Sequence, residues 1–210
     1  MHLFEFLGII AAVFQVVGYY TYYRLSISGH IRPNAASWLI WFYGNAIVCI
    51  SYLSIGEISL ADLLPIVCAI SNIVIVVALW NKKFFAPIEP YEKKVIASDI
   101  GITILWLFLE YSKFGNLFEN ATNIPVVLAV HLLLLLSACI SFIPVIKDTL
   151  SDTCAEDKRP WIVWSFAYLI WFVAESLTGF SWNMVYPGLY LILHSTVFII
   201  LLIRKTKPVC

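Results

Sequence analysis

The chain has 210 residues, of which 61% are hydrophobic and only 12% are charged, and its mean hydropathy is +0.89. Soluble domains carry about 25% charged residues, so a water-soluble domain of this length could not hide so many apolar side chains. The formal net charge is zero, which gives no indication of a nucleic-acid partner. The composition predicts an all-α protein that crosses a lipid bilayer several times.

Seven apolar runs follow one another along the chain, most of them near the length of about 20 residues that a membrane-spanning helix requires. We interpret the first run as a retained span, because no basic residue precedes it and no cleavage site is obvious. The fourth run is short and contains Asp99. The runs cover residues 6–24, 37–55, 60–81, 97–112, 124–146, 160–179 and 184–204.

The basic residues decide whether the fourth run crosses the membrane. If all seven runs cross, 12 lysines and arginines lie on one side and only Lys113 lies on the other. If the fourth run does not cross, the division becomes 7 to 6, which has no bias. Because cytosolic loops carry an excess of basic residues, the charges predict seven helices, with the N-terminus outside and the C-terminus in the cytosol.

An internal repeat gives the same number of helices. Two Trp-x-x-Trp pairs, Trp38/Trp41 and Trp161/Trp164, lie 123 positions apart, and the same offset aligns their surroundings without an insertion. Such self-similarity indicates a duplicated unit. A unit of three helices crosses the membrane an odd number of times, so a parallel second copy needs one extra crossing, which the fourth run supplies.

The predicted architecture is therefore two parallel three-helix repeats joined by a linker helix. The first repeat covers residues 1–82. A cytosolic linker, the fourth helix and an outer loop occupy 83–122. The second repeat and a short tail cover 123–210.

Polar residues mark a first candidate binding site in the middle of two runs. Ser71 and Asn72 lie midway along the third run, and His194 and Ser195 lie midway along the seventh. The repeat offset places Ser71 on His194 and Asn72 on Ser195. Since unpaired polar groups are costly inside a bilayer, we expect them to face a substrate between the halves. The alternative is that they only bond between helices.

A second candidate constellation lies on the second and sixth runs, where spacings of 4, 7 and 11 share one helical face. Stacked aromatic rings with a few polar groups suit a flat or ring-shaped solute. The alternative is an aromatic belt at the membrane interface, and we expect Trp38 and Trp161, near helix ends, to belong to it. The candidate face consists of Trp41 and Asn45 in the second run, and of Trp164, Tyr168, Trp171 and Glu175 in the sixth.

Ionisable residues in the runs have different expected roles. We expect Asp62 and Asp99 to open the third and fourth helices, where a carboxylate interacts favourably with the helix dipole. His194 is the deepest titratable group, so it is the first candidate for proton coupling, and Glu175 is the second.

Prolines mark the candidate hinges. Pro65, Pro144 and Pro187 lie inside apolar runs, and helix breaks at such positions are often where transporter helices flex.

Motifs for chemistry are lacking in the sequence. It contains no Cys-x-x-Cys, His-Glu-x-x-His or Gly-x-Ser-x-Gly pattern, and its five cysteines are interpreted as apolar core residues. We therefore predict no enzymatic activity, no cofactor and no metal.

With these residues in view, the chain resembles the superfamily of SWEET, PQ-loop and nicotinamide-riboside-type vitamin transporters, which share a three-one-three helix plan. Pro144 and Pro160 match prolines of the SWEET proteins, and Asn72 matches an asparagine of their third helix. The Trp-x-x-Trp of the sixth run, followed by Gly179, resembles the vitamin transporters. The chain departs from the pattern at Ser195, where SWEET proteins have a second asparagine.

The resemblance implies a transporter that moves a small solute by alternating access between its halves, through facilitated diffusion or proton coupling. The alternative is a seven-helix receptor or sorting protein that binds a small ligand or a peptide. The sequence leaves open which solute is bound and whether the chain forms a homo-oligomer.

Overall fold

The structure is a computed structural model, which describes residues 2–54, 60, 63–114, 124–151, 155–177, 179 and 184–204, without the side chains of 48, 50–54, 110–114 and 124–131. The predicted all-α fold and the predicted number of helices are confirmed for these residues. The helices are α1 (Leu3–Ile27), α2 (Ala35–Ser54), α3 (Leu63–Asn81), α4 (Pro90–Phe114), α5 (Ile124–Ser151), α6 (Lys158–Ser176) and α7 (Val185–Ile203).

Four of these helices are long and apolar enough to cross a membrane, namely α1, α3, α7 and the part of α5 from Leu132 to Ser151. Many of their apolar side chains point away from the core. Val74 of α3 is 60% exposed and Ile192 of α7 is 63% exposed. A surface on which large apolar side chains are exposed along several helices is compatible with a membrane environment.

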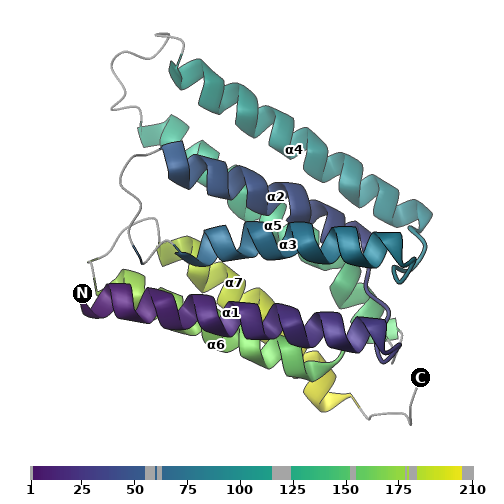
Figure 1. Cartoon of the computed structure of the whole chain (residues 1–210). Coiled ribbons are helices and arrows are strands. Elements are labelled where there is room, and N and C mark those ends of the chain that lie inside the picture. Colours follow the sequence, from purple (N-terminus) through teal and green to yellow (C-terminus); the bar gives the residue numbers. More distant parts are fainter. Residues whose placement is uncertain are drawn as a thin grey trace.

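The helices lie roughly along one direction, so that α1 begins at one end of the bundle and α7 ends at the other (Figure 1). Helix α1 packs against α3 and α6, and α2 packs against α3, α4 and α5. Helix α7 packs against α5 and α6, while α4 lies at the edge of the bundle against α2 and α5 (Figure 1).

Side-chain caps fix the start of α2 and of α6. Asn34 accepts a hydrogen bond from the backbone N–H of Ser37 at 2.9 Å, and Asp157 accepts one from the backbone N–H of Arg159 at 2.8 Å. Such caps satisfy N–H groups that have no partner inside the helix.

The fourth helix begins earlier than its apolar run indicates. It starts at Pro90, because proline suits the first position of a helix, where its missing N–H is not needed. The expectation that Asp99 opens this helix is therefore wrong. Asp99 lies well inside α4, fully buried, and the predicted cytosolic linker is partly helical.

A polar network ties α4 to the bundle near its first turn. The side-chain amide of Asn34 donates hydrogen bonds to Glu92 and, at 2.6 Å, to Oδ2 of Asp148 on α5. Lys147 Nζ lies 3.1 Å from the centre of the Tyr91 ring. Because these contacts join α2, α4 and α5, they set the position of α4 at this end.

The three candidate hinge prolines occupy different places. Pro65 and Pro187 lie in the first turns of α3 and α7, where no intrahelical hydrogen bond is lost. Pro144 lies in the interior of α5, where proline does remove such a bond. Their role as hinges stays a prediction.

The contact between α1 and α6 depends on Gly18. A Cβ atom at this position would lie 2.3 Å from Nε1 of Trp164, and no real Cβ contact is so short. Gly18 therefore allows the Trp164 ring to lie directly against the α1 backbone.

We predict that Gly18→Ala lowers the free energy of unfolding by about 1–3 kcal/mol, the usual cost of overpacking a core. Thermal unfolding of the purified protein in detergent measures the effect. Gly101→Ala is the matched control, because a Cβ at that helical position meets nothing within 4 Å and alanine is the better helix former. Equal stability of the two variants would contradict the assigned contact.

Candidate functional site

The four tryptophans of the two Trp-x-x-Trp pairs meet in the centre of the bundle. The ring centroids of Trp38 and Trp41 are 5.4 Å apart, those of Trp161 and Trp164 are 5.2 Å apart, and Trp41 lies 6.2 Å from Trp161. All four rings are buried. The expectation that Trp38 and Trp161 face the membrane interface is therefore wrong, since both are packed among other aromatic rings.

Three of the four indole N–H groups have an acceptor. Trp38 donates to the Tyr22 hydroxyl at 3.1 Å, and Trp41 donates to Oγ of Ser141 at 2.8 Å. Trp161 donates to Oε2 of Glu156 at 2.9 Å. The indole N–H of Trp164 has no partner, because Gly18 offers it no side chain.

A small cavity lies beside these rings, and we name it the central cavity. Its volume is about 20 Å³, which is room for about one water molecule. Five helices contribute to its wall, so residues far apart in the sequence converge there. The lining residues are Gln15, Tyr19, Trp38, Trp41, Asn45, Phe142, Trp164, Tyr168, Tyr190 and His194.

Unpartnered polar atoms gather around the central cavity. Gln15 and Trp164 line it, and among the described residues neither Oε1 of Gln15 nor Nε1 of Trp164 has a hydrogen-bond partner. The Asn72 amide donates to the Tyr19 hydroxyl at 2.6 Å and to the Cys68 carbonyl at 2.9 Å, while its own Oδ1 has no partner. A buried group without a partner costs about 1–3 kcal/mol, so the unpartnered atoms of Gln15 and Trp164, the two that belong to lining residues, favour a polar ligand or water in the cavity.

His194 completes the wall of the central cavity on the α7 side. Its Nδ1 lies 2.8 Å from the carbonyl oxygen of Tyr190. Because a carbonyl only accepts, Nδ1 carries a hydrogen, and in the neutral ring Nε2 is then an acceptor. The ring centroid lies 4.7 Å from that of Tyr168 and 5.0 Å from that of Phe142. The histidine is thus held in one orientation within an aromatic wall.

The structure brings together only part of the predicted site. Trp41, Asn45, Trp164, Tyr168 and His194 line the central cavity, and Asn72 contacts one of its residues. The other predicted residues do not line it. Ser71 and Ser195 are half-buried, while the Trp171 indole donates to Oε1 of Glu175 at 3.1 Å. Asp62 lies outside the described residues.

Sequence reasoning missed five residues of the wall, namely Trp38, which was assigned to the membrane interface, and Gln15, Tyr19, Phe142 and Tyr190. The repeat offset of 123 pairs Tyr19 with Phe142, so this signal could have found both. Gln15 precedes Tyr19 by four residues on the same helical face. Tyr190 precedes His194 by the same spacing.

A buried glutamate side chain lies next to the tryptophans at one end of α6. Glu156, in the connection before α6, is 5% exposed, and its Oε1 accepts a hydrogen bond from the Tyr22 hydroxyl at 2.7 Å. Burial raises the pKa of Glu156 to about 8, although the hydrogen bonds from Tyr22 and Trp161 act in the opposite direction. Glu156 therefore connects α1 and α6 through a group that titrates near neutral pH.

Metal ligands do not cluster in the described part of the chain, where no three His, Cys, Asp or Glu side chains lie close enough to share an ion. Comparison of the chain with protein-family models, with curated proteins and with solved structures gave no match. The geometry of the central cavity is therefore the basis for a functional proposal.

We predict that Glu156 makes the stability of the protein depend on pH. The pKa is raised from 4.5 to about 8 in the folded chain, so the folded state holds a proton that the unfolded state has released. The contribution to stability is therefore present below about pH 4.5 and is lost as the pH rises through about 8. The apparent Tm of the wild type should fall across this range.

Replacement of the titrating group should remove this dependence. The Tm of Glu156→Gln should change less with pH than that of the wild type, whereas Glu89→Gln, at an exposed position, should keep the wild-type slope. Differential scanning calorimetry in detergent at a series of pH values measures both. A wild-type slope in Glu156→Gln would contradict the assignment.

Proposed function

We propose that the chain is an integral membrane carrier that moves a small polar or ring-shaped solute by alternating access between two three-helix halves. The observation that supports this most is the central cavity. Its wall includes Gln15, Tyr19 and Asn45 from the first half and Tyr168 and His194 from the second. A site lined from both halves becomes accessible from either side when the halves tilt against each other.

Helix packing supports the proposed repeat. Under the offset of 123 residues, α1 corresponds to α5, α2 to α6 and α3 to α7. The contact of α1 with α6 then corresponds to that of α5 with α2. Likewise, α1 with α3 corresponds to α5 with α7, and α2 with α3 corresponds to α6 with α7. Every one of these contacts occurs together with its counterpart, which is the arrangement that a pseudo-twofold axis produces.

Individual residues support the repeat as well. The capping residues Asn34 and Asp157 are separated by the same offset. Trp164 packs against Gly18, and its counterpart Trp41 bonds to Ser141, the residue that corresponds to Gly18. Equivalent contacts therefore join α1 to α6 and α2 to α5.

The chemistry of the wall supports the class of solute. Aromatic rings favour stacking with a flat ring, and the unpartnered oxygen of Gln15 would accept a hydrogen bond from a solute. The indole N–H of Trp164 would donate one. Since the cavity has room for about one water molecule, the proposed mechanism requires that the halves separate to admit a solute.

We expect a true solute to raise the apparent Tm of the purified wild type and to accumulate in proteoliposomes. A panel of sugars, nucleosides, vitamins and amino acids, screened with and without a pH gradient, identifies it. Asn72→Ala should abolish the Tm shift, because it removes the hydrogen bond that holds the Tyr19 hydroxyl in the wall of the central cavity.

Thr196→Ala is the matched control for the solute effect. The Thr196 hydroxyl bonds to the backbone of its own helix, at Ile192 O, and does not line the central cavity, so this variant should keep the full Tm shift. If no solute of the panel is accumulated, the carrier proposal fails.

We predict that the two chain ends lie on opposite faces of the membrane, as an odd number of crossings requires, with the C-terminus cytosolic. A membrane-impermeant reagent applied to intact cells should label a cysteine added at the N-terminus of a variant whose own cysteines are replaced. It should not label one added at the C-terminus until the membrane is permeabilised. Labelling of both ends from the same face would exclude seven crossings.

A further inference from the structure

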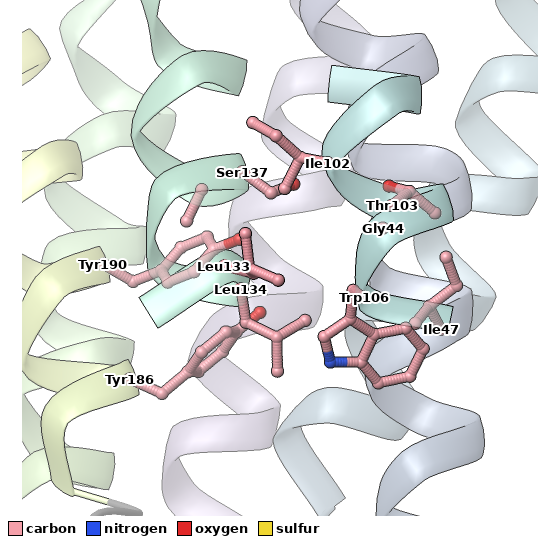
Figure 2. A pocket seen from close by; sticks show the side chains of 11 residues that line it. Gly44, Ile47, Ile102, Thr103, Trp106, Leu133, Leu134, Ser137, Tyr186 and Tyr190 are labelled. Carbon is pink, nitrogen blue, oxygen red and sulfur yellow. The ribbon is translucent and has the colours of Figure 1, made fainter. Parts of the chain in front are cut away.

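A second cavity lies between α4 and the rest of the bundle, and we name it the α4 cavity. Its volume is about 30 Å³, which is enough for about two water molecules. Tyr186 and Tyr190 reach into it from α7, and the Trp106 ring lies across from them (Figure 2). The residues that line it are Gly44, Ile47, Ile102, Thr103, Trp106, Leu133, Leu134, Ser137, Ala138, Tyr186 and Tyr190.

A buried carboxylate lies next to the α4 cavity, in the middle of a helix that is otherwise apolar on its outer side. Asp99 is fully buried, whereas Ile104 and Phe108 of the same helix are largely exposed. Asp99 precedes Ile102, Thr103 and Trp106, which line the cavity, by three, four and seven residues. These spacings place the carboxylate on the face of α4 that looks toward the cavity.

The surroundings of Asp99 leave its negative charge without a cation among the described side chains. The Tyr43 hydroxyl of α2 donates a hydrogen bond to Oδ2, and the Ser137 hydroxyl of α5 lies close enough to interact. Tyr190 of α7 is the further titratable group that is close enough to influence it. Within the described part of the chain, Oδ1 of Asp99 has no hydrogen-bond partner.

A second unpartnered group points to a polar occupant of the α4 cavity. The indole N–H of Trp106 has no partner among the described side chains although the ring is buried, and its nitrogen is turned toward the cavity in Figure 2. A donor of this kind is satisfied by a water molecule. The cavity thus has both the volume and the polar partners for water next to the carboxylate.

From this arrangement we infer that Asp99 is a proton-binding site of the carrier, supplied by water in the α4 cavity. A water molecule in the cavity passes one proton to Oδ1 and takes up another from the surrounding solution, so that no hydroxide ion remains. The carboxylate becomes a neutral carboxylic acid while it keeps its contact with Tyr43. A buried carboxylate without a cation is unfavourable in its charged form, so the site favours proton uptake. A divalent metal ion would need several oxygen ligands, whereas the described residues supply one carboxylate.

Tyr190 connects this site with the central cavity, because its ring lines both. A change at Asp99 that moves Tyr190 therefore also changes the wall of the solute site. The consequence is coupling between proton uptake at Asp99 and movement of the solute. This part of the inference rests on the proposed carrier function, whereas proton binding itself does not.

Infrared difference spectroscopy of the protein in lipid nanodiscs, between acid and alkaline buffer, tests proton binding without any solute. Because the buried Glu156 carboxyl group also binds a proton in this pH range, the Glu156→Gln variant is the background for the measurement. We expect the band of a second protonated buried carboxyl group in this background, its loss when Asp99→Asn is added and its retention when Glu89→Gln is added. Tyr43→Phe should shift the frequency of the band, because it removes the hydrogen bond to Oδ2, and this result does not require Asp99→Asn to fold. A band unchanged in both Asp99→Asn and Tyr43→Phe would overturn the inference.

Uptake into proteoliposomes tests the coupling once a solute is known. An inward proton gradient should stimulate uptake by the wild type and by Asp99→Glu, which keeps a carboxyl group. Asp99→Asn should lose the stimulation but keep the solute-induced Tm shift. Stimulation that persists in Asp99→Asn, or that follows a sodium gradient instead, would overturn the coupling. If no solute is found, the carrier proposal fails, while the infrared result still decides whether Asp99 binds a proton.

Discussion

The centre of this bundle is organised by the need to give each buried indole N–H an acceptor where water is scarce. Two of these N–H groups are connected to the side chain of Glu156. Trp161 donates to it directly, and Trp38 donates to the Tyr22 hydroxyl, which in turn donates to Glu156. That chain of bonds joins α1, α2 and α6. Burial of a tryptophan removes a large apolar area from water, but its N–H also needs a hydrogen-bond acceptor, which only a few neighbouring residues provide. The helices are therefore held in one arrangement at this layer.

The central cavity lies beside Trp164, whose indole N–H has no such acceptor among the described residues. Trp41 and Trp164 occupy corresponding positions in the two halves, yet Ser141 accepts from one, while Gly18 offers nothing to the other. The difference is a single side chain. Polar atoms that would be a defect in an ordinary core are grouped beside one small space, next to an amide that is only partly satisfied. This grouping, more than the volume of the cavity, distinguishes the site from incidental packing space.

Patterns along the chain predicted the helices and half of the site, for identifiable reasons. The composition of a segment reflects the solvent around it, so the apolar runs and the basic loops were enough to predict the seven helices. Trp164 and Tyr168 were found because helical spacing places them on one face. The burial of Trp38 could not be derived, since it depends on the rings of Tyr19 and Tyr22 that α1 places against it. Asp99 was misplaced because the start of α4 follows Pro90 and not the edge of the apolar run.

The aromatic wall of the central cavity also gives the protein an intrinsic fluorescence signal that reports on the cavity. The four tryptophans of the two Trp-x-x-Trp pairs lie in the core with the centroids of neighbouring rings 5.2–6.2 Å apart, and three of them line the cavity. Indole emission responds to the polarity of its surroundings and to stacked neighbours. Entry of water or of a flat ring among these rings would therefore change the intrinsic fluorescence of the unmodified chain, and opening and closing could be followed in real time without an attached dye.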